Sequence, residues 1–291
     1  MIVDAHQHFW NPARGDYGWL KPDNPIHRVF SADDLRPLMA QAGVDATIIV
    51  QAAPTPAESD YMLGIARTTP WILGVVGWID LGAADAVKEV QHRAGDPLFL
   101  GVRPMLQDLA DPNWILQAKL APALNAIATE GLAFDALILS HQIAAIIELA
   151  KRHPQLSIVL DHAAKPQFGD RDAMAKWASE IEHLAALPNV TCKVSGLLTE
   201  LKPGGSRDDI VRAIDRLFDL FGRDRLLWGS DWPVLTLSDC FAGAGDYQGW
   251  FKLAREAIAV RDSSAIPAIM GGNALRIYRP GKSRLGRHIN A

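Results

Sequence analysis

The sequence predicts an α/β fold, a single (β/α)8 barrel of the TIM type with parallel strands. Three observations favour it. Short β-branched runs alternate with longer stretches of helical apolar spacing along the whole chain. The strand candidates are mostly apolar, as is typical of parallel strands covered by helices. Eight of them can be counted, and eight strand-helix units close naturally into a barrel. They lie at residues 2–7, 46–51, 72–79, 99–105, 132–138, 156–163, 190–196 and 225–231.

The helical segments between these strands have recognisable starts and stops. Ser31 and Asp34 form a capping-box pattern before a helix that Gly43 should end. The stretch 206–222 repeats this scheme. A further helix is expected over 140–152, where apolar residues at helical spacing are followed by basic residues near the end.

An open doubly wound sheet is the alternative architecture. It is disfavoured because no glycine-rich phosphate fingerprint follows the first strand, where such folds carry one. No composition break or low-complexity linker divides the chain of 291 residues. We therefore expect one domain over residues 1–291, with a basic surface tail at approximately 279–291.

Composition excludes several classes of protein. A hydrophobic content of 49%, a charged content of 21% and a net charge of -4 describe a globular chain without the basic footprint of nucleic-acid binding. No apolar run approaches the roughly 18 residues of a membrane span, and no signal-peptide pattern precedes the first strand. Cys192 and Cys240 lack metal or redox spacing, which fits a reducing compartment. We expect a cytoplasmic protein without nucleic-acid or membrane partners, of open oligomeric state.

Polar residues recur at the predicted strand ends, where barrel enzymes carry their catalytic groups. In "DAHQHFW" at 4–10, alternation places Asp4, His6 and His8 on one strand face, with Asp4 deeper as a structural partner. Each polar residue alone is more simply a helix cap or a turn residue. Burying several charged groups together is costly unless they pair or bind a ligand, so their coincidence predicts a site. The remaining members are Gln51, Arg103, Asp135, His162, Lys165, Lys193, Ser195 and Asp231.

These residues stand in motifs that resemble the amidohydrolase superfamily. The motifs are His-x-His in the first strand, "LDHAAKP" at 160–166, "KVSGL" at 193–197, "LLWGSDWP" at 226–233 and "GGNALRIY" at 271–278. They are most similar to the amidohydrolase-related branch that contains pyrone dicarboxylate lactonase and sugar lactonases such as L-fuconolactonase and L-rhamnonolactonase. The likeness covers residues 2 to about 278. It implies a hydrolase that opens a small sugar lactone to the hydroxy acid.

The resemblance also implies a metal site, with His6, His8, Asp231 and, as a fourth candidate, His162 as its ligands. Binuclear members of the superfamily carry a lysine or glutamate on the fourth strand, where this chain has Arg103, and a histidine on the fifth, where it has Asp135. A guanidinium is always charged and only donates, so Arg103 would repel a second cation. One zinc ion would still suit the donor set. Because lactones are activated esters, we expect no obligatory cofactor, with zinc as an optional ligand.

The expected mechanism is attack of water on the lactone carbonyl, with Asp231 as the general base. His162 and Arg103 would hold the oxyanion, supported by His6 or His8, and a protonated histidine or Asp231 would return the proton to the ring oxygen. The lack of a second arginine near the strand ends favours a neutral lactone, with L-fuconolactone as the first candidate. Substrate contacts are expected from Gln51, Trp10, Lys165, Lys193 and Trp232.

Three other functions stay open at this point. A metal-dependent decarboxylase of the same superfamily would require zinc and release carbon dioxide. An amide or imide hydrolase would depend more on a metal, because its leaving group is poorer. A non-catalytic sugar-binding barrel would bind without turnover, but it has little need for a base beside so many imidazoles.

Overall fold

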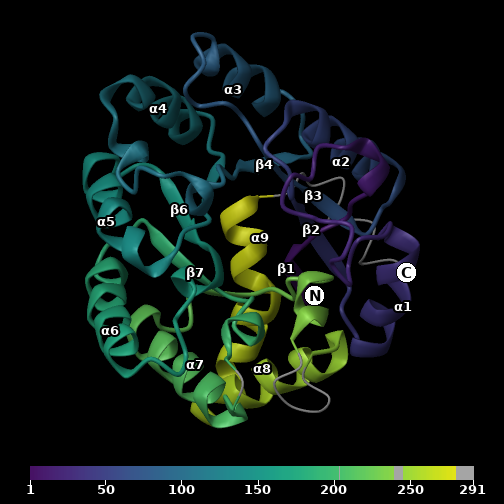
Figure 1. Cartoon of the computed structure of the whole chain (residues 1–291), viewed down its shortest axis with the longest axis vertical. Coiled ribbons are helices and arrows are strands. Elements are labelled where there is room, and N and C mark those ends of the chain that lie inside the picture. Colours follow the sequence, from purple (N-terminus) through teal and green to yellow (C-terminus); the bar gives the residue numbers. More distant parts are fainter. Residues whose placement is uncertain (203, 239–244, 280–291) are drawn as a thin grey trace.

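All eight predicted strands are present in one parallel sheet with the order β1 to β8 (Figure 1). The computed structural model describes residues 1–202, 204–238 and 245–279. Most strands are shorter than expected at their C-terminal ends. Their bounds are Val3–Gln7 for β1, Ala46–Val50 for β2, Ile72–Gly77 for β3, Phe99–Val102 for β4, Ala133–Ala136 for β5, Ser157–Leu160 for β6, Val190–Val194 for β7 and Leu226–Trp228 for β8.

Backbone hydrogen bonds join β1 to the segment directly after β8 and so close the sheet. The amide of Asp231 donates to the carbonyl of His6 at 2.7 Å, and the amide of His8 donates to the carbonyl of Trp232 at 2.8 Å. The predicted (β/α)8 barrel is therefore confirmed. This closure brings residues from both ends of the chain to one place.

A helix follows each strand, and the helices ring the barrel (Figure 1). The predicted capping box of Ser31 and Asp34 starts α1, and Gly43, with φ +70°, ends it. The second predicted box, Ser206 with Asp209, starts α7. The helix bounds are Ala32–Ala42 for α1, Pro56–Thr68 for α2, Ala86–Ala94 for α3, Ala121–Thr129 for α4, Ile143–Arg152 for α5, Arg171–Ala185 for α6, Arg207–Phe221 for α7, Tyr247–Asp262 for α8 and Asn273–Tyr278 for α9.

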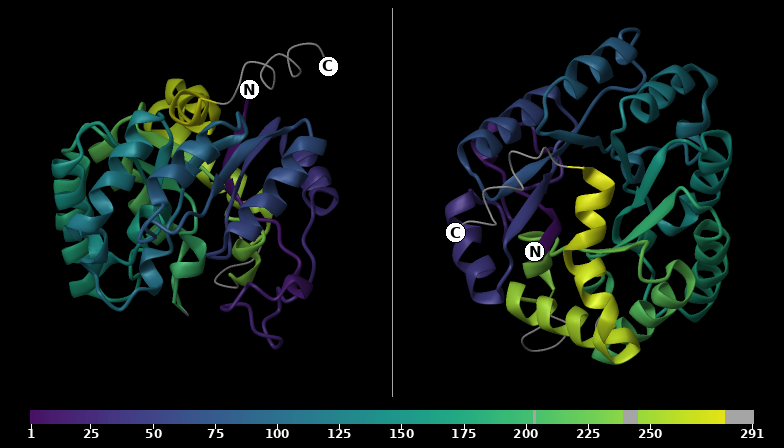
Figure 2. Two further views of the ribbon diagram at one scale, coloured as in Figure 1. Left: turned by 90° about the horizontal axis from the view of Figure 1, so that it is seen from above. Right: turned by 180° about the vertical axis from the view of Figure 1, so that it is seen from behind.

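The last helix, α9, lies across the end of the barrel where the strands begin (right view of Figure 2). Gly271, just before α9, approaches the carbonyl of Met1 so closely that a Cβ atom there would overlap it. Ile277 and Tyr278 pack with Val3 and Ala5 in the apolar interior of the barrel. The N-terminal end of the barrel is therefore plugged, and the polar strand ends lie at the other end.

Part of the chain falls outside this description. Cys192 is buried as a free thiol, whereas Cys240 and residues 280–291 of the expected tail lie outside the described residues. Within the described ranges, no helix combines the length and apolar character that crossing a bilayer requires.

Candidate active site

A cavity of about 190 Å³ lies at the C-terminal ends of the strands. Its polar lining includes five of the predicted site residues, which come from segments after β1, β4, β6 and β8. These are His8, Arg103, His162, Lys165 and Asp231. Side chains far apart in sequence therefore share one enclosure, as the strand-end argument predicted.

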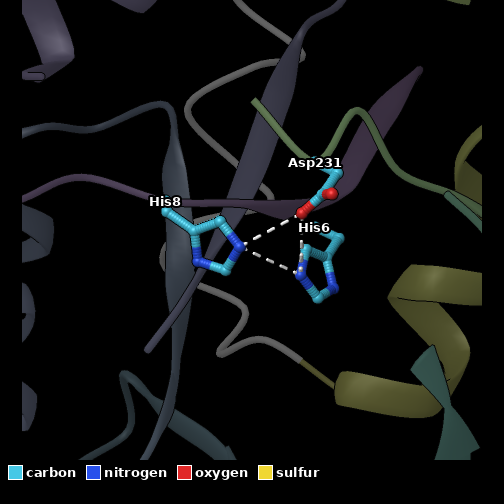
Figure 3. A group of neighbouring side chains, drawn as sticks. All are labelled: His6, His8 and Asp231. Atoms are coloured by element: carbon cyan, nitrogen blue, oxygen red, sulfur yellow. Dashed lines mark hydrogen bonds and ion pairs between the residues drawn. The ribbon is translucent and has the colours of Figure 1, made fainter. Parts of the chain in front are cut away.

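The Asp231 carboxylate, which lines this cavity, faces the imidazole nitrogens of His6 and His8 (Figure 3). Its Oδ1 atom lies 3.2 Å from Nε2 of His8, 3.6 Å from Nε2 of His6 and 3.8 Å from Nε2 of His162. The Nε2 atoms of His6 and His8 are themselves 3.2 Å apart. All four side chains are at most 5% exposed. One carboxylate oxygen is thus surrounded by three buried imidazoles.

Asp4 does not join His6 and His8 on one face, contrary to the expected stripe. The register between β1 and β2 shifts between Asp4 and Gln7, and such an irregularity re-aims the side chains around it. The Asp4 carboxylate instead accepts hydrogen bonds from the Tyr247 hydroxyl at 3.0 Å and the Ser230 amide at 2.8 Å. The expectation that Asp4 is structural is confirmed, since it ties β1 to the segment that carries Asp231.

His162 begins a run of four consecutive left-handed residues, with φ between +51° and +58° from His162 to Lys165. The sequence predicted a strand to residue 163, but β6 ends at Leu160. Left-handed backbone costs about 1–2 kcal/mol for each non-glycine residue and persists only where the surroundings hold it. Here the Nδ1 atom of His162 bonds to the Ser195 hydroxyl at 2.9 Å, and the Trp177 indole donates to the Ala163 carbonyl at 2.8 Å. The turn aims His162 into the cavity.

Arg103 follows β4 and is 3% exposed, with its guanidinium held on two sides. It donates to Asp161 Oδ2 at 3.2 Å and to the carbonyl of Gln51, whose own carboxamide donates back to the Arg103 carbonyl at 2.8 Å. Gln51 is fully buried and does not line the cavity, which corrects its expected contact with substrate. We infer that it positions Arg103.

Lys193 lies beneath the cavity floor and is fully buried, which corrects its expected contact with substrate. Its ammonium is 2.5 Å from Asp135 Oδ2 and 2.9 Å from Asp161 Oδ1. Asp135, at the end of β5, is likewise a buried partner of Lys193 and does not line the cavity. Its carboxylate accepts hydrogen bonds from the Lys193 ammonium and the Tyr278 hydroxyl. These groups form a buried ionic layer between the site and α9.

The expected tryptophan contacts are also corrected. Trp10 is fully buried behind His8, with ring centroids 6.2 Å apart, and Trp232 packs against Phe30. Neither lines the cavity among the described residues, whereas Trp19 does. Trp19 contacts the edge of Trp10 and donates its indole N–H to the Ala52 carbonyl at 2.7 Å. The cavity therefore has an aromatic wall, but Trp19, in the loop between β1 and α1, forms it instead of Trp10 or Trp232.

Sequence reasoning missed two further carboxylates of the site. Asp161 immediately precedes His162 in "LDHAAKP", so its position at the end of the sixth strand was an available signal. Glu200 lines the cavity and lies 3.8 Å from the Lys165 ammonium. It follows β7 by six residues, and no local pattern marks it or Trp19 as cavity residues.

Burial and mutual contacts shift the pKa values of these groups. Burial alone would raise the pKa of Asp231, but the adjacent imidazoles of His162, His8 and His6 hold it below its usual range. Burial lowers the pKa of His162 to about 4, and burial with the nearby Lys193 charge lowers that of His6. At neutral pH the site therefore holds an ionised Asp231 carboxylate beside the neutral imidazoles of His6 and His162.

The geometry of this group fits a single zinc ion. Tetrahedral zinc with bonds of about 2.0–2.1 Å separates its ligands by about 3.3 Å. The Nε2 atoms of His6 and His8 and Oδ1 of Asp231 are 3.2, 3.2 and 3.6 Å from one another. A second cation beside Asp161 is disfavoured, because Lys193 and Arg103 already occupy this carboxylate. The residues that would hold one zinc ion are His6, His8 and Asp231, near His162.

Comparisons with known proteins identify the family of this chain. The amidohydrolase family model matches residues 3–279. L-fucono-1,5-lactonase of Burkholderia ambifaria is 42% identical over 281 residues, which is 95% of each chain. L-fucono-1,5-lactonase of Burkholderia multivorans is 34% identical, covering 98% of this chain and 99% of that protein.

A solved structure resembles the whole barrel. It is the crystal structure of an amidohydrolase from Burkholderia multivorans with bound zinc, which is 33% identical and superposes with a TM-score of 0.89. The match covers 97% of this chain and all of that one. With the family model spanning nearly every described residue and the histidine-aspartate group in place, this chain belongs to the amidohydrolase family.

Proposed function

We propose that this protein is a lactonase that hydrolyses a small neutral sugar lactone, with L-fucono-1,5-lactone as the first candidate, to the hydroxy acid. The observation that carries the proposal is the Asp231 carboxylate, which lines one cavity with His8, His162 and Arg103 and has the buried imidazole of His6 3.6 Å away. The two Burkholderia relatives named L-fucono-1,5-lactonase support the substrate class.

Asp231 is the proposed general base. Its carboxylate is ionised and points into the cavity, where it takes a proton from the water that attacks the lactone carbonyl. The carbon-oxygen bond to the ring then breaks. Asp231, which holds the proton taken from water, returns it to the departing ring oxygen, so the base is regenerated with each turnover.

Arg103 and His162 are the proposed donors to the oxyanion. Arg103 supplies a fixed charge that its contacts with Asp161 and Gln51 orient before substrate arrives. When the Ser195 hydroxyl donates to Nδ1 of His162, the proton of this neutral imidazole lies on Nε2, which faces the cavity. Such preorganised donors stabilise charge that develops only in the transition state.

The cavity wall suits a hydroxylated ring without a carboxylate. Trp19, Met105 and Leu137 offer an apolar surface, and polar groups surround it. Both cations of the lining already face carboxylates: Arg103 pairs with Asp161, and Lys165 lies 3.8 Å from Glu200. A dicarboxylate substrate would lack a free cationic partner, whereas sugar hydroxyls can bond to Lys165, Glu200 and Thr199.

We propose that zinc can bind His6, His8 and Asp231 without being required. A bound zinc ion supplies Lewis-acid polarisation of a carbonyl, which an amide needs more than an activated ester. The zinc-bound amidohydrolase from Burkholderia multivorans supports the capacity to bind. The fixed donors Arg103 and His162 support turnover in its absence.

The decisive experiment is a pH-indicator assay over a panel of aldonolactones, each run with and without chelator. We expect acid release well above the spontaneous rate with a neutral 1,5-lactone in both conditions. Carbon dioxide release from an aromatic acid, with no lactone turnover, would indicate a decarboxylase. Ligand binding across the panel without product would indicate a sugar-binding barrel.

A further inference from the structure

The fully buried Lys193 presents its ammonium to three acceptors at once. Asp135 Oδ2 lies 2.5 Å from Nζ, Asp161 Oδ1 lies 2.9 Å away, and the Nδ1 atom of His6 lies 3.0 Å away. An ammonium group has three protons to donate and no capacity to accept. Two of these protons are donated to Asp135 Oδ2 and to Nδ1 of His6, whereas the contact with Asp161 Oδ1 is an ion pair without a hydrogen bond.

Neighbouring groups hold Lys193 in this position. The Tyr278 hydroxyl, from the helix that plugs the barrel, contacts both oxygens of Asp135 at 2.9 and 2.8 Å. Arg103 donates to the other oxygen of Asp161 at 3.2 Å. Both carboxylates beside Lys193 are therefore themselves anchored, and the side chain has little freedom to turn away from His6.

We propose that Lys193 is a positioning residue that keeps the proton of His6 on Nε2. Because Nδ1 must accept the hydrogen bond from the ammonium, a neutral imidazole carries its proton on the opposite nitrogen. Asp161 Oδ1 is the competing partner of Nδ1 and would favour the other tautomer. It lies 3.3 Å from Nδ1, farther than Nζ of Lys193.

A proton on Nε2 of His6 has two acceptors nearby, Nε2 of His8 and Oδ1 of Asp231. The Nδ1 atom of His8 is 2.8 Å from the Val50 carbonyl, which can only accept, so Nδ1 carries a proton and the lone pair of a neutral His8 ring lies on Nε2. Nε2 of His6 lies 3.2 Å from that lone pair and 3.6 Å from Asp231 Oδ1. A proton on Nε2 of His6 can therefore be shared with Nε2 of His8 and with Asp231 Oδ1, which would otherwise repel the lone pair of His6. The same proton blocks the nitrogen lone pair that a metal ion would bind.

Lys193 thereby weakens metal binding by this chain. A zinc ion binds imidazole through a lone pair, so binding at Nε2 of His6 requires the proton to leave and the bond to Lys193 to break. Without Lys193, Nδ1–H of His6 could donate a hydrogen bond to Asp161. A histidine that binds a metal commonly donates its other ring N–H to a carboxylate in this way. The position of this proton and its effect on zinc affinity do not depend on the proposed lactonase activity.

The first test reads the proton directly in metal-free protein without substrate. Nitrogen-15 NMR of histidine-labelled wild type, with the His6 signals assigned by their absence in His6→Gln, reports which ring nitrogen is protonated. We expect the proton on Nε2 of His6. A proton on Nδ1 would overturn the proposal. Because this measurement uses the wild-type chain, no folding defect can obscure it.

The second test removes the donor together with one carboxylate, so that the net buried charge is kept. In Lys193→Met/Asp135→Asn we expect the His6 proton to move to Nδ1 and zinc affinity, measured by competition with a chromogenic chelator, to rise about 10- to 100-fold. The control is Lys176→Met, which removes a lysine that is 66% exposed and should leave zinc affinity unchanged. Unchanged affinity in a folded double variant would contradict the role of Lys193. Failure of every lactone assay, with the proton on Nε2, would count against the proposed function alone.

Discussion

The amide of Asp231 donates a hydrogen bond of 2.7 Å to the carbonyl of His6, across the seam where the two ends of the barrel meet. The backbone at Asp231 is left-handed, with φ +59°, which turns its carboxylate toward the imidazoles. Gly229 permits this approach, because a Cβ atom there would lie 2.6 Å from Cβ of His6. The distance between base and imidazole is thus set by the backbone as well as by side-chain contacts.

Asp231→Asn should lower kcat/KM for the lactone by at least about 100-fold, because an amide cannot take the proton from water. The fold should survive, since the backbone bond to His6 remains. Steady-state kinetics and circular dichroism measure the two effects. Asp80→Asn, at an exposed carboxylate after β3, is the matched control and should keep wild-type activity. Near-normal turnover by Asp231→Asn would remove Asp231 from the role of base.

Arg103→Lys should lower kcat by about 100-fold although the charge is kept. A lysine cannot contact Asp161 and the Gln51 carbonyl while still donating to the cavity, so the oxyanion loses an oriented donor. The control is Arg93→Lys, at an arginine that is 9% exposed and pairs with Asp60 and Glu89 away from the cavity. A kcat within threefold of wild type for Arg103→Lys would show that charge alone suffices.

Gly196→Ala should reduce both stability and turnover. Gly196 has φ +63°, and a Cβ atom there would overlap Nδ1 of His162, so the imidazole must leave its bond with Ser195. Gly43→Ala isolates the backbone effect, because Gly43 has φ +70° and nothing within 4 Å of an added Cβ. We expect each variant to lose about 1–2 kcal/mol in urea unfolding and only Gly196→Ala to lose at least about tenfold in kcat. Equal kcat values would contradict the positioning of His162 by this contact.

Glu58 should make stability depend on pH. Burial raises the pKa of Glu58 to about 7. Hydrogen bonds from the Ala53 and Ala52 amides lower this pKa, but their effect is smaller than that of burial. Between the ordinary value of 4.5 and about 7 the folded protein keeps this proton while the unfolded chain loses it, so the contribution of Glu58 to stability falls as pH rises. The destabilisation by Glu58→Gln should be larger at pH 5 than at pH 7.5, by about 2 kcal/mol.

Urea unfolding at the two pH values measures this difference. Glu148→Gln is the control, because Glu148 is a carboxylate 45% exposed that pairs with Arg152 on the surface of α5. Its effect should be the same at both values. A pH-independent effect of Glu58→Gln would contradict the raised pKa.

Removal of metal should leave lactone hydrolysis intact. Protein dialysed against chelator, with zinc content checked by mass spectrometry, is expected to retain full activity, because the fixed donors act on an activated ester. Added zinc should not increase the rate. Loss of activity on chelation and its recovery with zinc would reverse this expectation and make the ion obligatory.

Local patterns in the sequence determined most of the architecture. The apolar runs marked all eight strands, and the caps at Ser31 and Ser206 marked two helix starts, because these signals act between residues close in the chain. The same patterns placed His8, His162, Asp231 and other polar residues at strand ends, which a barrel collects at one mouth.

Only the tertiary structure decided which polar side chains face the cavity. Lys193 points beneath the floor, Gln51 holds Arg103, and Trp19 lines the cavity in place of Trp10. The direction of a side chain near a strand end depends on register shifts, such as that after Asp4, and on left-handed turns, such as that from His162. Contacts from distant parts of the chain hold these backbone features, so spacing within a single strand cannot predict them.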